Sequence, residues 1–138
     1  MNGIAFNIVV ALVVVVEYVV VPSLFAWGWV RWLILPKPRT LFSILSFVGF
    51  ALATASAVLA GSLILYGYSN GAGSVSYQDP WLLPLLRWGF LLSSGAVAFG
   101  IAAVWRPSAL RWHALACGVA TLLFWSLTET TLQSATTR

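Results

Sequence analysis

Few residues of this chain could do chemistry, and the most unusual of them is a single carboxylate. Glu17 stands in the middle of the apolar run VVVVEYVVV at residues 13–21. An ionisable group at such a depth in a membrane span is costly, and function is a common reason for its presence. Glu17 is therefore a candidate site for a proton or a cation. The alternative is a buried hydrogen-bonding group that fixes how helices pack.

Other polar groups stand at a similar depth in the remaining apolar runs. With Glu17 they form a candidate polar layer, made of Thr54, Ser56, Ser93, Ser94 and Thr121. A neutral Glu17 could donate a hydrogen bond to this layer, whereas an ionised Glu17 needs a cation. Arg87 is the nearest candidate, about 9 Å along the helix axis from the middle of its own span. Hydroxyl groups within membrane spans also commonly bond neighbouring helices.

Enzyme and metal chemistry find little support in the residue types. The chain has one Cys and one His, and no second carboxylate, Cys or His stands at a spacing that would make a metal or nucleophile site. His113 is a weak haem candidate, because the chain offers no second axial ligand except Met1 unless a symmetric dimer supplies two His. We therefore expect no enzymatic activity, no metal and no cofactor.

Composition decides the class of protein that positions these groups. Of the 138 residues, 61% are hydrophobic and 7% charged, against roughly 25% charged in soluble chains. The chain is therefore predicted to be an integral membrane protein with a single domain, residues 1–138. The net charge of +4 does not indicate a nucleic-acid partner, because most basic residues flank apolar runs, as membrane anchors do. These are Arg31, Lys37, Arg39, Arg87, Arg106 and Arg111.

Four apolar runs are long enough to cross a bilayer, which takes about 20 residues. They cover about residues 4–30, 40–66, 81–105 and 109–132, with a connection at 67–80. Because no water satisfies the backbone inside a bilayer, each run is predicted to be a helix. The predicted fold class is an all-α membrane bundle of four transmembrane helices with antiparallel neighbours. Pro22 should kink the first helix or tighten a turn there, and we interpret the eight Trp as an interfacial belt rather than a pigment site.

Short connections rich in Lys and Arg predict the orientation. The connections at 31–39 and 105–111 carry most of the basic residues, which places them on the cytoplasmic side of the cell (inner) membrane. Both termini and the 67–80 connection are then outside.

Small residues predict which helices pack closely, since association in lipid depends on close backbone approach. The second run carries a stripe at spacing four, made of Gly49, Ala53, Ala57 and Gly61. The third run offers Gly89, Ser93, Ala96 and Gly100, and the fourth offers Ala114 and Gly118. The first run is bulky and rich in Val, so it is expected at the edge of the bundle.

Four short helices with a carboxylate midway along the first resemble the small multidrug resistance transporters. In that family this Glu binds protons and cationic drugs within a dimer. The resemblance covers Glu17 and the number of helices, and the 67–80 connection departs from the family's short connections. We expect a non-enzymatic accessory or scaffold subunit, or a homo-oligomer, acting through helix contacts. Its partners would be the lipid bilayer and other membrane subunits or itself. The alternative is a proton-coupled small transporter or channel that uses Glu17.

Overall fold

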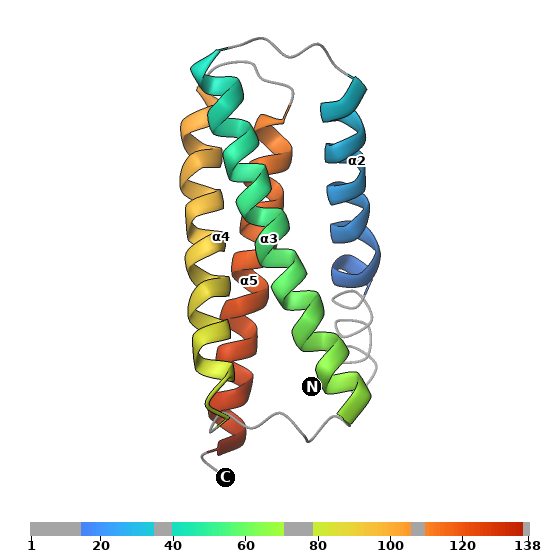
Figure 1. Cartoon of the computed structure of the whole chain (residues 1–138), viewed down its shortest axis with the longest axis vertical. Helices are drawn as coiled ribbons and strands as arrows, with labels where there is room; N and C mark the ends of the chain where they lie inside the picture. Colours follow the sequence, from blue (N-terminus) through green and yellow to red (C-terminus); the bar gives the residue numbers. More distant parts are fainter. Residues whose placement is uncertain (1–14, 35–39, 71–78, 106–109, 137–138) are drawn as a thin grey trace, which may run out of the picture.

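The described residues form four α-helices that lie side by side, and successive helices run in opposite directions (Figure 1). The structure, a computed structural model, describes residues 15–34, 40–70, 79–105 and 110–136, apart from the side chains of 16, 17 and 132–136. A π-helical turn, η1 (Val16–Val20), leads directly into α2 (Val21–Ile34). The longer helices are α3 (Leu41–Asn70), α4 (Leu82–Val104) and α5 (Arg111–Thr136). The all-α prediction is therefore confirmed over the described residues.

Three of the described helices are long and apolar enough to cross a membrane. They are Leu41–Asn70, Leu82–Val104 and, within α5, Arg111–Thr131. The apolar helix Tyr18–Ile34 is shorter within the described residues, and the expected first span, 4–30, lies partly outside them.

Three helices run beyond the boundaries expected from the sequence, and the last of them, α5, continues to Thr136. α2 continues through Arg31 to Ile34, because no helix-breaking residue follows until Pro36. α3 continues to Asn70, so the expected connection at 67–80 begins four residues later. Its last turn is closed by side chains, since the Asn70 amide and the Ser69 hydroxyl both donate to the Tyr66 carbonyl, at 3.0 and 3.1 Å. These bonds satisfy a carbonyl that the helix end leaves free.

The core lies between α3, α4 and α5, and the buried residues of α4 show how it is built. They alternate steps of four and three along the helix, namely Leu82, Leu86, Gly89, Ser93, Ala96, Gly100 and Ala103. A mean period of 3.5 residues keeps one seam of a helix facing its partners, as in a left-handed coiled coil. Most residues of this seam are small, so the three helices approach closely.

The closest approach of the three helices is centred on Ala96 and Gly100 of α4. A Cβ atom built on Gly100 would lie 3.0 Å from the Leu115 Cα of α5, and one on Gly118 would lie 3.1 Å from the Val97 nitrogen. A Cβ on Gly49 of α3 would lie 3.2 Å from the Ala96 carbonyl oxygen. Backbone therefore meets backbone at three places, which is the packing that small residues permit in lipid.

The stripe expected on the second helix divides between two surfaces. Gly49 and Ala53 are buried against the core, whereas Ala57 and Gly61 line an open groove. The physical reason is geometric, because four residues turn an α-helix by about 400° and each step overshoots by about 40°. The buried seam of α3 instead continues through Ser56, Ala60 and Leu63.

Helix α2 lies at the edge of this core, as its bulky sequence predicted. Its backbone approaches α5, while aromatic side chains connect it to α3. The Phe50 ring lies against Gly28 and contacts Phe25, with ring centres 5.8 Å apart, and Trp32 stacks on Phe47 at 4.7 Å. Figure 1 shows α2 and α4 on opposite sides of α3 and α5.

Candidate functional site

Glu17 belongs to the π-helical turn η1, and Pro22 explains why that turn is there. Proline has no N–H for the carbonyl four residues earlier, at Tyr18, and its ring collides with that carbonyl. The chain responds with a wider turn immediately before Pro22, where the sequence predicted a kink or a tighter turn. The Ser23 hydroxyl donates to the Val19 carbonyl at 2.6 Å, so a side chain helps to satisfy the disturbed backbone. Single π-helical turns of this kind occur frequently at functional sites.

An open groove of about 510 Å³ lies beside this turn. Tyr18, Val21, Pro22 and Phe25 form one wall, while α5 forms the other with Ala120, Thr121 and Phe124. The floor is the C-terminal half of α3, where side chains are small at Ala57, Ala60 and Gly61. A Cβ atom on Gly61 would meet no heavy atom within 4 Å. The groove therefore exists because small residues leave space between three helices.

Two residues of the predicted polar layer, Thr54 and Thr121, reach this groove. The Thr54 hydroxyl donates to the Phe50 carbonyl at 2.9 Å. The Thr121 hydroxyl lies 3.0 Å from both the Cys117 and the Gly118 carbonyl. Because both hydroxyl protons are used within their own helices, the groove presents an almost entirely apolar surface. The side chain of Glu17 lies outside the described residues, and the next residue, Tyr18, lines the groove.

Two other members of the predicted layer, Ser56 and Ser93, meet inside the core instead. Their hydroxyl oxygens are 2.7 Å apart, and the Ser93 hydroxyl donates to the Gly89 carbonyl at 2.8 Å. The indole N–H of Trp125 donates to Ser56 at 2.8 Å. One chain of hydrogen bonds thus joins α5, α3 and α4. Ser94, the next residue along α4, is half-buried and is not part of this chain.

Trp125 is a key residue that the sequence interpretation missed. It is 1% exposed and packs in the core, so the interfacial-belt interpretation is wrong for this tryptophan. The sequence did hold a signal, because Trp125 stands well inside the fourth apolar run rather than at its end. An indole N–H buried at such a depth needs an acceptor, and a serine on a neighbouring helix is a suitable one.

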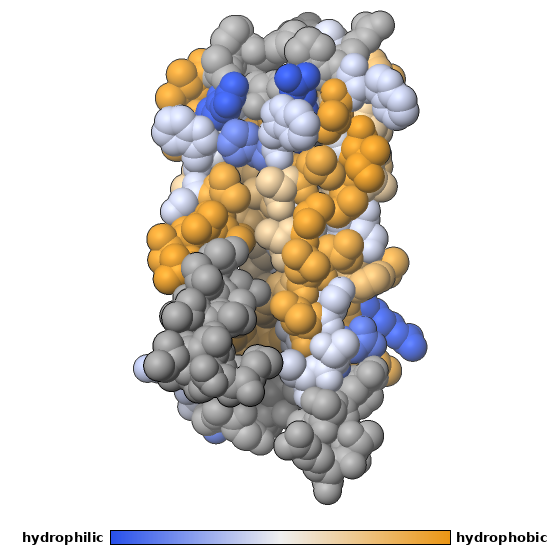
Figure 2. All heavy atoms as spheres, turned by 180° about the vertical axis from the view of Figure 1, so that it is seen from behind, coloured by the Kyte–Doolittle hydropathy of each residue, from blue (hydrophilic) through white to orange (hydrophobic). Residues whose placement is uncertain are grey.

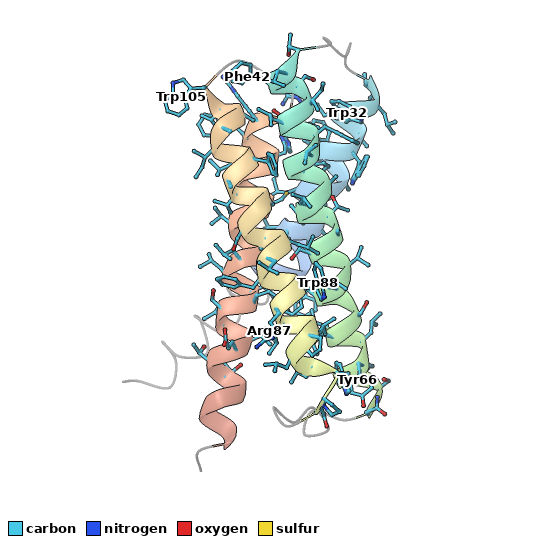
Figure 3. The ribbon with its side chains drawn as sticks, turned by 60° about the vertical axis from the view of Figure 1, so that its left-hand side comes forward. Trp32, Phe42, Tyr66, Arg87, Trp88 and Trp105 are labelled. Atoms are coloured by element: carbon cyan, nitrogen blue, oxygen red, sulfur yellow. The ribbon has the colours of Figure 1, made fainter. Side chains whose placement is uncertain are left out.

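The structure does not bring the elements of Glu17 and Arg87 together. Arg87 is exposed near the start of α4, in the lower half of the molecule (Figure 3). α4 packs against α3 and α5, which separate it from η1 and α2. Within one chain, Arg87 therefore stands across the bundle from the turn that carries Glu17.

His113 lies at the other end of the molecule, in the first turn of α5. Arg31 stands in the last turn of α2, a helix that contacts α5. Among the residues that the structure describes, no three His, Cys, Asp or Glu side chains gather in a way that could hold a metal ion.

No protein-family model, curated protein or solved structure matches this chain. The resemblance to small multidrug resistance transporters therefore remains limited to Glu17 and the number of helices.

Proposed function

We propose that the chain is a non-enzymatic, multi-pass membrane subunit that binds a transmembrane helix in the groove between α2, α3 and α5. In this proposal the segment before η1 completes a fourth span, and the protein resides in the cell membrane. The bound helix belongs to another membrane subunit or to a second copy of this chain. The observation that carries the proposal is the open, apolar groove with small residues on its floor.

The chemistry of the groove supports a helix as its occupant. Small residues allow a second backbone to approach closely, and such approach drives helix association in lipid. Ala57 and Gly61 stand four residues apart on the same floor, which is the small-xxx-small spacing of helix contacts. Hydrophobic side chains cover the middle of the face shown in Figure 2, and a hollow is visible among them. In water such an apolar surface would promote aggregation, whereas in lipid it can bind a partner helix.

Gly61→Leu tests the proposal, because Gly61 lines the groove and a Cβ atom added there would meet no heavy atom within 4 Å. We expect native mass spectrometry from nanodiscs to show the wild type with a bound partner or as an oligomer, and the variant as a monomer. Ala55→Leu is the matched control, since it places the same side chain at an exposed position of α3 that does not line the groove. A wild type that is strictly monomeric and has no co-purifying partner contradicts the proposal.

A proton-coupled small transporter is the second candidate. The observation that favours it is the π-helical turn at Glu17, directly beside the groove. A carboxyl group there would exchange protons with a substrate that enters the groove from the side. Glu17→Gln should then keep the fold and abolish proton-dependent flux in liposomes. Equal flux through wild type and variant, or no flux through the wild type, rules this candidate out.

A further inference from the structure

Positively charged side chains of two helices converge at one end of the bundle. Arg31 comes from the last turn of α2 and Arg111 from the first turn of α5, which also carries the imidazole of His113. α2 contacts α5, and the C-terminal end of α2 lies at the same end of the bundle as the N-terminal end of α5 (Figure 1). Figure 2 shows strongly hydrophilic side chains gathered at this end of the face and hydrophobic ones below them.

The protein supplies no carboxylate at this end to neutralise these cations. The three acidic residues of the sequence are Glu17, Asp79 and Glu129. Asp79 precedes α4 and Glu129 lies toward the end of α5, both at the opposite end of the bundle. Glu17 is 14 residues before Arg31, or roughly 21 Å along a helix. The N-terminus of α5 adds the partial positive charge of a helix dipole.

The surroundings of these cations suit a lipid better than a free ion. The Arg111 guanidinium lies 5.7 Å from the centre of the Trp112 ring, and indole rings favour the depth of lipid headgroups. Beside Arg31, Leu33 and Ile34 are 71% and 75% exposed, which provides an apolar surface for acyl chains. Arginine binds phosphate oxygens through two parallel hydrogen bonds. A ligand with a phosphate headgroup and alkyl chains would use both surfaces together.

We propose that Arg31, Arg111 and His113 form a binding site for the headgroup of an anionic phospholipid. The guanidinium groups hold the phosphate, and the acyl chains lie along the exposed apolar side chains at the ends of α2 and α5. The site does not depend on the groove or on the helix that we propose binds there. Basic pockets between helix ends on the cytoplasmic side of membrane proteins bind anionic headgroups in the same way.

Native mass spectrometry of the full chain, released from nanodiscs of equal phosphatidylglycerol and phosphatidylcholine, tests this site. The wild type should retain phosphatidylglycerol in preference to phosphatidylcholine. Arg31→Gln and Arg111→Gln should each reduce that preference about fivefold, which corresponds to about 1 kcal/mol for a basic residue near a membrane surface. Arg87→Gln is the matched control, because it removes the same charge at the opposite end and should leave the preference unchanged.

The other outcomes also decide the proposal. Equal retention of the two lipids by the wild type overturns it, even if the Gln variants fail to fold. An equal loss in Arg87→Gln overturns it too, since the effect would then follow net charge alone. Displacement of the lipid by a large excess of inorganic phosphate would show a free-anion site and would also overturn it. The double variant Arg31→Lys/Arg111→Lys should keep more of the preference than Arg31→Gln/Arg111→Gln, because the charges remain although the paired hydrogen bonds of arginine are lost; equal losses in the two double variants would overturn the charge-based site.

Discussion

At the scale of single residues, the core depends on a pairing between a glycine and a tryptophan. The Trp125 ring packs on the backbone of α4 at Gly89, where no side chain intervenes. That position lets the indole N–H reach Ser56 and complete the hydrogen-bond chain to Ser93. In the part of the chain that the structure describes, every buried side-chain nitrogen and oxygen has a hydrogen-bond partner. A polar network inside an apolar core stabilises it only when it is satisfied in this way.

Gly89→Ala should therefore destabilise the protein. A methyl group at this position would collide with the Trp125 ring, which has no free space to move into, and overpacking of this kind costs about 1–3 kcal/mol. Gly95→Ala is the matched control on the same helix, because its methyl group would meet only the flexible end of Leu52, at 3.3 Å. Unfolding in mixed micelles followed by circular dichroism measures both. Equal stabilities of the two variants would contradict the proposed role of Gly89.

At the scale of elements, the sequence predicted where the helices lie in the chain, but it predicted less well which face of each helix is buried. Long apolar runs predict α3, α4 and α5 directly, since their length and composition suffice. The buried face of each helix repeats about every 3.5 residues on average. The predicted stripe used a spacing of four residues and therefore grouped Gly61 with the buried residues, whereas Gly61 lines the groove. The π-helical turn was also missed, because Pro22 shows that an α-helix is disturbed but does not show how the backbone responds.

Pro22→Ala should convert the π-helical turn into regular α-helix. Alanine restores the N–H that can donate to the Tyr18 carbonyl and removes the ring that collides with it. Losing the extra residue of the wide turn rotates the preceding segment by about 100° relative to α2. Positions 18 and 58 both line the groove. The distance between nitroxide labels at these positions should then change by several ångström, because a rotation of this size moves a side chain by about the radius of a helix. Double electron–electron resonance in a Cys117→Ala background measures it.

The matched control for this experiment is Pro84→Ala. Pro84 stands in the first turn of α4, where proline is tolerated because no N–H is needed. The same label pair should report an unchanged distance in that variant. An unchanged distance in Pro22→Ala would show that tertiary contacts hold the wide turn without the proline.

At the scale of the whole molecule, charge and hydropathy are arranged along the long axis. Arg31 and Arg111 lie at one end, and the chain segments joined to that end add Lys37, Arg39 and Arg106 in the sequence. Such a bias can be predicted from the sequence, because it depends only on which connections carry the basic residues. The groove was not readable, since it arises where three helices leave space between them. Neither were the partners of Trp125, which come from separate helices.

The same charge bias predicts the orientation of the protein in a membrane. Connections rich in Lys and Arg remain cytoplasmic, so the end that carries Trp105 should face the cytoplasm and the end that carries Tyr68 should face outward. Both side chains are strongly exposed, at 83% and 89%, and stand at opposite ends of the bundle. Either can therefore be replaced by Cys without disturbing the core, in a Cys117→Ala background. In intact cells a membrane-impermeant maleimide should label Tyr68→Cys at once and Trp105→Cys only after permeabilisation. The reverse pattern would place Arg31 and Arg111 outside and contradict the charge argument, while labelling of both without permeabilisation would contradict a spanning arrangement.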